Sequence, residues 1–194
     1  MEAKKLQVKF FLEQTSVKLE AIVPVFHAWI REHKLGSEML VDVADYAHVP
    51  NGPGVVLIGD ASDYYLDLGD GRPGLLYSRK RYGDADPVLR VEDALRRALN
   101  ACRLLESEES LSPRFRFRTD EVLLRANDRL RAENTDAGFA AARPALEAAL
   151  TKLYGKLPKL ERVGSPSELL TVKVTAAGAA DVKSLLDRLG GAPS

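Results

Sequence analysis

Residues 55–80, with the sequence VVLIGDASDYYLDLGDGRPGLLYSRK, decide the fold class of this chain. Three runs rich in β-branched and aromatic residues are separated first by the turn-forming stretch 59–62 and then by Asp70-Gly71. An Asp-Gly pair between two such runs is a strong signal for a β-hairpin, because both residues tolerate the backbone of a tight turn. The stretch therefore predicts a three-stranded antiparallel meander with strands at 55–58, 63–68 and 75–80.

Further strands and four helices flank this meander. The runs at 6–12 and 39–46 favour strands, and similar runs return at 157–163 and 169–175. Apolar spacings of three and four, together with capping and stop signals, predict helices over 20–33, 87–107, 134–154 and 179–189. Pro144 falls inside the third of these helices, so we expect a kink there or two helices.

The segment Arg114-Phe-Arg-Phe-Arg118 alternates apolar and basic residues, and a second apolar run follows at 121–125. This pattern predicts a second hairpin or one bent strand. The phenylalanines would point inward and the three arginines outward, as on any half-exposed strand. On an edge strand such arginines would discourage unwanted pairing with other chains.

The resulting order of elements is β-α-β-βββ-α-β-β-α-β-β-α, which is typical of the α+β class. We expect a largely antiparallel sheet with helices packed on one face. One arrangement that fits this order is two side-by-side split-βαβ (ferredoxin-like) units. No linker of biased composition divides the chain, so residues 1–194 are expected to form a single compact α+β unit, with pseudo-halves at 1–118 and 119–194.

Composition excludes several classes of protein. The chain has 28 Lys plus Arg and 28 Asp plus Glu, so no long-range field would collect nucleic acid or anionic membrane. No stretch approaches the ~18 uninterrupted apolar residues of a membrane span, and the first residues lack the apolar core of a leader. Cys102 stands alone within a helical apolar pattern, which predicts a buried side chain and a reducing compartment. We therefore expect a cytoplasmic protein.

The least usual stretch lies between Lys34 and Arg72, where seven acidic residues occur and no lysine or arginine. Two carboxylates and an imidazole near the end of a strand could bind a divalent metal, or pair a histidine base with an orienting carboxylate. Neighbouring glycines would let a ligand approach the backbone closely. The candidate ligand-binding residues are Asp42, Asp45, Tyr46, His48, Asn51, Gly52 and Gly54.

A structural role competes with this hypothesis. Asp42 and Asp45 are three residues apart, so on a regular strand their side chains point to opposite faces. Aspartates in turns are expected to form local hydrogen bonds, and His48 could simply donate to a loop carbonyl. The ligand set for a metal is incomplete, and we therefore expect no bound metal and no cofactor.

No Gly-rich phosphate loop, nucleophile elbow or zinc-binding helix motif occurs, so no pattern assigns a reaction. The leading hypothesis is a protein that binds a protein partner, or assembles with itself as a homodimer, through the edges of its sheet. The alternative is an enzyme or small-ligand-binding protein that uses Asp45, Tyr46 and His48 beside the Pro/Gly loop at 49–54. Nucleic-acid binding by the arginines of 77–82 and 114–118 is disfavoured, since acidic and basic segments of one meander neutralise each other.

Overall fold

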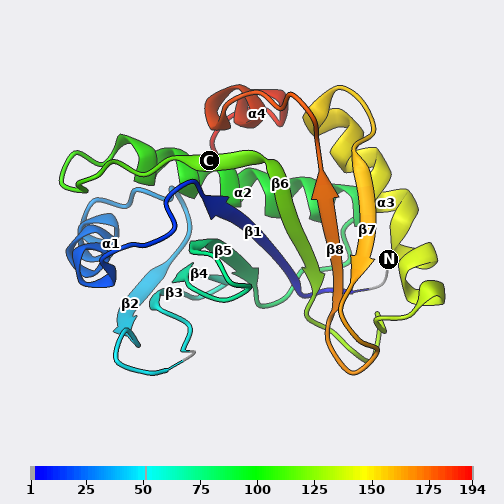
Figure 1. Ribbon diagram of the computed structural model, residues 1–194, viewed down its shortest axis with the longest axis horizontal. Helices are drawn as coiled ribbons and strands as arrows, with labels where there is room; N and C mark the ends of the chain where they lie inside the picture. The colour runs from blue at the N-terminus through cyan, green and yellow to red at the C-terminus, as the bar shows by residue number, and fades with distance from the viewer. Residues whose placement is uncertain (1–2, 51, 194) are drawn as a thin grey trace.

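The computed structural model describes residues 3–50 and 52–193, and its centre is one eight-stranded sheet (Figure 1). The strand order is β2-β3-β4-β5-β1-β6-β8-β7, and every neighbouring pair is antiparallel. The first four strands along the sheet are β2 (Leu40–Asp45), β3 (Val55–Gly59), β4 (Ser62–Asp67) and β5 (Gly74–Arg79). The other four are β1 (Leu6–Leu12), β6 (Phe117–Ala126), β8 (Leu170–Thr175) and β7 (Lys159–Val163).

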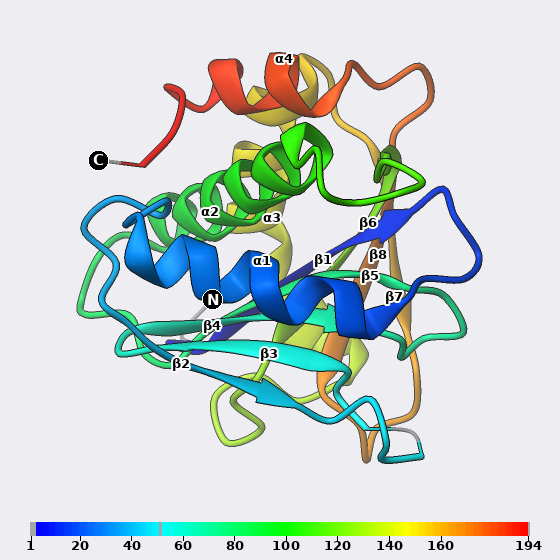
Figure 2. The same cartoon turned by 90° about the vertical axis from the view of Figure 1, so that its left-hand side faces the viewer.

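All helices lie on one side of this sheet (Figure 2). They are α1 (Ile22–Arg31), which follows the short 3-10 turn η1 (Leu19–Ala21), then α2 (Pro87–Ser107), α3 (Asp136–Tyr154) and α4 (Val182–Arg188). Helix α1 packs on β2 and β3, α2 on β1 and β5, and α3 on β8. Helix α4 packs mainly on α2 and α3 and so forms an outer layer.

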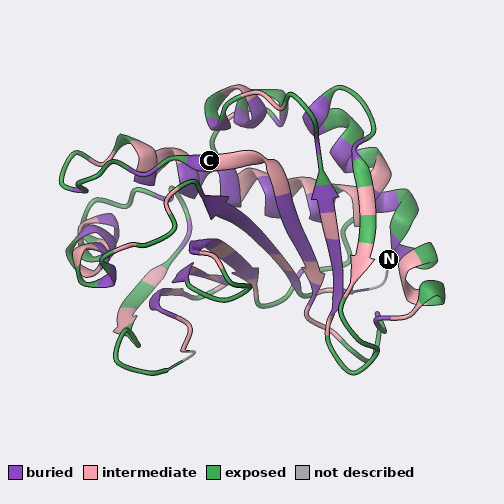
Figure 3. Ribbon diagram, in the orientation of Figure 1, coloured by how far each residue is buried: buried purple, intermediate pink, exposed green. Residues whose placement is uncertain are grey.

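The core lies between the sheet and the helices because one face of each central strand is apolar. Along β1, Leu6, Val8, Phe10 and Leu12 are buried in one continuous cluster with residues of α2. The strand register continues this apolar face onto the neighbouring strands: Val8 lies opposite Tyr77 of β5 on one side and Leu124 of β6 on the other. Figure 3 shows this distribution, with buried residues on the central strands and exposed ones on β2 and β7.

The expected class is confirmed: four α-helices cover one face of an antiparallel sheet. The three-strand meander and the 87–107 helix occur as predicted, and Asp86 caps that helix by accepting from the Val88 amide at 2.8 Å. Two ferredoxin-like units are not confirmed. In the first half three strands, rather than one, lie between β1 and β2, and the second half has only β6, β7 and β8.

Two local predictions need correction. Residues 114–116 lie outside the strand, and β6 is central, so the arginine-bearing segment protects no edge. The edges are β2 and β7 instead. Helix α3 runs through Pro144 as one helix, which excludes two separate helices. Pro144 and Ala140 are both exposed, so water can bond the carbonyl that loses its intrahelical donor.

Cys102 is fully buried in α2, as expected, and burial raises the pKa of its thiol well above the ordinary value. Among the residues that the structure describes, no helix combines the length and the apolar character needed to cross a membrane.

Candidate functional site

Strand β2 forms one edge of the sheet and pairs only with β3 within the described part of the chain. The Tyr46 amide donates to the Gly54 carbonyl at 2.8 Å, next to the β2–β3 ladder. Because hydrogen-bonded pairs alternate along an antiparallel ladder, Ala44 and Asp42 also bond to β3. The backbone groups of Val43 and Asp45 therefore point away from the sheet. The Val43 amide donates to the Asp42 carboxylate at 2.8 Å, so the Val43 carbonyl and both backbone groups of Asp45 are the ones available to another strand.

A β-bulge divides this edge. Leu40 lies opposite Gly59 and Asp42 opposite Ile58, so Val41 is an extra residue without a partner on β3. Bulges commonly re-aim side chains at sheet edges. Here the regular stretch open to pairing is 42–45, with Val41 projecting beside it.

Large apolar side chains are exposed along this edge. The exposed fractions are 68% for Met39, 61% for Val41, 41% for Tyr46 and 39% for Val49. The carboxylates of Asp42, Asp45 and Asp60 lie in the same hairpin, since the Asp60 amide donates to the Met39 carbonyl at 2.8 Å. We call these seven residues the β2 edge surface: Met39, Val41, Asp42, Asp45, Tyr46, Val49 and Asp60.

The three carboxylates of this surface have no ion-pair partner among the described residues. Asp42 accepts only from the neighbouring Val43 amide, and Asp45 accepts from the Ala47 amide, both at 2.8 Å. The second contact is the local turn expected of aspartate. The negative charge of the edge therefore stays largely uncompensated.

The structure does not gather the sequence-predicted ligand residues into one site. Asp42 and Asp45 lie opposite Ile58 and Val55, an odd number of residues apart, and so face opposite sides of the sheet. Tyr46 and His48 are exposed, and His48 has no hydrogen-bond partner within the described residues. Asn51 lies outside the described residues.

Gly52 and Gly54 serve the backbone of the loop. Gly54 has φ of +73°, and a Cβ added there would lie 2.0 Å from the Leu66 carbonyl oxygen. A Cβ at Gly52 would lie 2.8 Å from the Cβ of Val49. The space that we expected a ligand to use at Gly54 is thus taken by strand β4.

No observation places a small-molecule or metal site in this segment. Five of the best-formed cavities lie elsewhere in the molecule. No cluster of three or more His, Cys, Asp or Glu side chains in residues 3–50 and 52–193 is placed to hold a metal ion. The absence of bound metal stays a prediction, and elemental analysis of the dialysed protein tests it.

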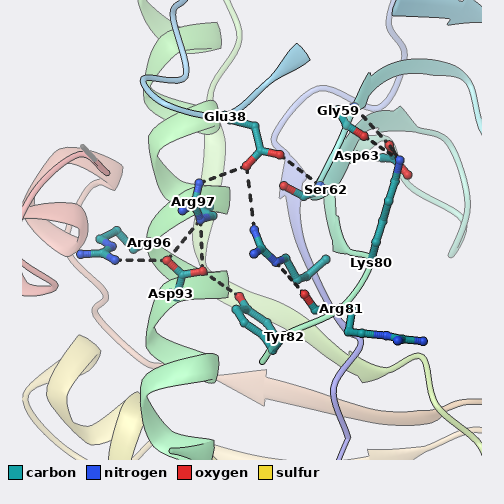
Figure 4. Close-up of polar contacts among 11 residues, drawn as sticks. Glu38, Gly59, Ser62, Asp63, Lys80, Arg81, Tyr82, Asp93, Arg96 and Arg97 are labelled. Carbon is teal, nitrogen blue, oxygen red and sulfur yellow. Dashed lines mark hydrogen bonds and ion pairs between the residues drawn. The ribbon is translucent and has the colours of Figure 1, made fainter. Parts of the chain in front are cut away.

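The start of β2 is held by a group of buried and half-buried polar contacts that we call the Glu38 clamp: Glu38, Ser62, Tyr82, Asp93 and Arg97 (Figure 4). The Glu38 side chain is 2% exposed; its carboxylate accepts from the Ser62 amide at 3.1 Å and lies 3.2 Å from Arg97 Nη1. These contacts connect Glu38, two residues before β2, to strand β4 and helix α2. The β2 hairpin is therefore anchored at this end.

Asp93 completes the clamp from α2. It accepts from Arg97 Nε at 3.1 Å and from the Tyr82 hydroxyl at 2.9 Å. Burial alone would raise the pKa of Asp93, but the Arg97 charge and the Tyr82 hydroxyl outweigh it and lower the pKa. Burial also raises the pKa of Tyr82, so its hydroxyl stays protonated and donates to Asp93.

Sequence reasoning missed the clamp, since it counted Glu38 only as one of seven acids in a stretch without bases. The partners come from residues 24 and 59 positions further along the chain. The available signal was weak: Asp93 and Arg97 are spaced i,i+4 on a strongly predicted helix.

Comparison with known proteins adds no family to this description. No family model matches the chain, and no curated protein shows significant similarity to it.

Proposed function

We propose that this protein binds a protein partner by accepting an extended segment of that partner as an added strand along β2. The observation that carries the proposal is the combination, on one edge, of exposed apolar side chains with the outward-pointing Val43 carbonyl and Asp45 backbone groups, which no described residue bonds. Strand addition uses main-chain hydrogen bonds for affinity and alternate side chains for specificity. Burial of Val41 and Met39 would add the apolar contribution that edge hydrogen bonds alone lack.

The charge of the edge indicates the chemistry of the partner. Asp42, Asp45 and Asp60 are unpaired among the described residues, and no lysine or arginine occurs between Lys34 and Arg72. A segment that alternates apolar and basic residues would place its basic side chains on one face of the sheet, beside either Asp42 or Asp45, and its apolar side chains on the other face. In a homodimer formed through this edge, Asp42 and Asp45 of one copy would lie close to Asp42 and Asp45 of the other. Like charges on paired strands are destabilising.

A rigid edge supports the same proposal. Glu38 anchors the start of β2, and the Tyr46–Gly54 hydrogen bond closes its other end. Because the strand is ordered before binding, the free-energy cost of ordering falls mainly on the partner segment. The alternative of an enzyme or small-ligand site at Asp45, Tyr46 and His48 has no comparable support from a cavity or a contact.

The test uses two blocked seven-residue peptides, one alternating lysine with valine and one alternating glutamate with valine. Backbone NMR of the full chain should show the lysine peptide shifting amides of 41–46, and Val41→Lys should weaken binding about tenfold. The matched control is Leu130→Lys, because Leu130 is 98% exposed in a distant loop. This control should bind as the wild type does.

Three results would overturn the proposal. The first is no peptide-induced shift along 41–46, and the second is equal binding of the glutamate peptide. The third is a concentration-dependent doubling of the 21.3 kDa mass that Val41→Lys abolishes, which would assign the edge to a homodimer.

A further inference from the structure

A cavity of about 390 Å³ lies at the opposite end of the sheet from β2. It opens where the C-terminal end of α3, the start of β7 and the loop between β8 and α4 meet, at the upper right of Figure 1. Cavities of this size fall within the range that holds small molecules. No residue of the β2 edge surface or of the Glu38 clamp lines it.

Three cations line this cavity, and no carboxylate does. They are Lys156, Lys159 and Arg188, and they come from three different elements of the fold. In a chain with equal numbers of acidic and basic residues, such a one-signed lining marks a local positive field.

The cations are only partly used by the fold. Arg188 donates from Nη1 to the Leu153 carbonyl at 3.0 Å, at the last turn of α3, and Lys159 lies 2.9 Å from Glu161 on β7. Lys156 has no partner in the part of the chain that the structure describes. Stabilisation of the α3 C-terminus explains Arg188 and favours a cation at Lys156 as well, but it leaves the Lys156 ammonium without a bonded partner among the described residues.

Most of the other lining residues are apolar. They include four alanines, Ala176, Ala177, Ala179 and Ala180, together with Leu157 and Pro158, while Thr175 adds one hydroxyl. The Tyr154 hydroxyl already donates to the Thr119 carbonyl at 3.0 Å. The small alanine side chains leave space for a ligand.

We propose that this cavity binds a small organic anion in which one carboxylate or phosphate is joined to a short apolar body. The charged group lies against Lys156, Lys159 and Arg188, and the apolar body lies against the alanines of the lining. A free inorganic ion would satisfy the cations but leave the apolar walls uncovered, so it binds more weakly. This inference is independent of the β2 edge and stands whether or not that edge binds a partner.

The experiment titrates the full chain with phenyl phosphate and with hexanoate, followed by backbone NMR and calorimetry. Inorganic phosphate and phenol serve as charge-only and apolar-only probes. We expect one site, with shifted amides at 156–159 and 176–180, for at least one of the two organic anions. Inorganic phosphate and phenol should each bind at least about tenfold more weakly, since each satisfies only half of the lining.

Two variants separate this site from general surface charge. The double variant Lys156→Gln/Lys159→Gln should weaken binding about tenfold. The separate variant Ala177→Leu should weaken binding more than the double variant does, because the larger side chain fills the cavity. Lys183→Gln is the matched control: Lys183 is an exposed cation of α4 that does not line the cavity. It should bind as the wild type does.

The proposal is overturned if neither organic anion shifts 156–159 or 176–180 at millimolar concentration. It is equally overturned if the double variant and Ala177→Leu bind like the wild type. If inorganic phosphate binds as tightly as the organic anions, the apolar body of the ligand contributes nothing to binding, and the proposed ligand class is wrong.

Discussion

The two edge strands of the sheet, β2 and β7, differ in the charged and apolar side chains that they expose to solvent. Strand β2 carries Asp42 and Asp45 without a cation, and exposed Met39 and Val41 lie at its start. Strand β7 has the sequence KLERV, and its Lys159 and Glu161 form an ion pair on the sheet face. Charged residues of both signs are a usual protection of an edge strand, and β2 lacks the lysine that commonly supplies it.

This difference shows that a neutral net charge conceals separate regions of opposite charge. The stretch 35–71 holds seven acidic residues and no lysine or arginine, whereas three cations line the cavity beside β7. Each end of the sheet is also anchored differently. At the β2 end, the buried Glu38 carboxylate and the closely packed Gly54 hold the hairpin in place. At the β7 end, the Lys159–Glu161 ion pair is exposed, and Gly178 has no atom within 4 Å of an added Cβ.

The largest expected contrast concerns glycines at the two ends. Gly54→Ala should lower the free energy of unfolding by about 4 kcal/mol, because positive φ and contact with the Leu66 carbonyl both oppose a Cβ. Gly178 also has positive φ, but no atom lies within 4 Å of an added Cβ. Gly178→Ala should therefore cost only about 1 kcal/mol. Urea denaturation measures both, and equal losses would contradict the crowding at the β2 end.

Glutamates at the two ends provide the next contrast. Glu38→Ala should destabilise the fold by about 2 kcal/mol, because it leaves the Ser62 amide without its buried acceptor and removes one of the two carboxylates that hold Arg97. Glu161→Ala removes only an exposed carboxylate and should leave the unfolding free energy unchanged within error. Glu38→Gln is an intermediate control, since its amide oxygen can still accept from Ser62. A change at Glu161 as large as that at Glu38 would refute the difference in anchoring.

A smaller effect concerns acid sensitivity at the β2 end. Since the folded-state pKa of Asp93 is lowered from about 3.8, its stabilisation is present above that value and is lost as pH falls through the folded-state pKa. The wild type should therefore lose more stability than Asp93→Asn when pH is lowered from about 6 to about 3. Denaturation curves at several pH values measure this difference. Parallel losses in the two proteins would exclude a role for Asp93 in acid unfolding.

The smallest effect is expected at His48. His48→Ala should change the free energy of unfolding by less than about 0.5 kcal/mol, because the side chain is exposed and lacks a partner among the described residues. This loss should be smaller than that of Gly54→Ala in the same loop. A larger loss for His48→Ala than for Gly54→Ala would show that the histidine stabilises the fold.

Local patterns in the sequence determined most elements of this protein. The Asp70-Gly71 turn, the start of α2 at Pro87 and the end of α3 before Gly155 each depend on immediate neighbours, so the sequence predicts them directly. The opposite orientation of Asp42 and Asp45 also followed from the two-residue period of a strand. For the same reason, the sequence predicted the meander and the antiparallel α+β class.

Only the tertiary structure decided which strands lie at the edges. The pairing of β1 with β6 joins residues more than 100 positions apart, and no local pattern encodes such a partner. The same holds for the Glu38 clamp and for Lys9, which is fully buried on the open face of the sheet. The turn after β4 folds over Lys9, whose ammonium contacts Asp67 and donates to the Gly69 carbonyl at 2.6 Å. Charges so distant in sequence acquire their partners only when the sheet brings them together, and the placement of the acidic edge and the basic cavity follows from that assembly.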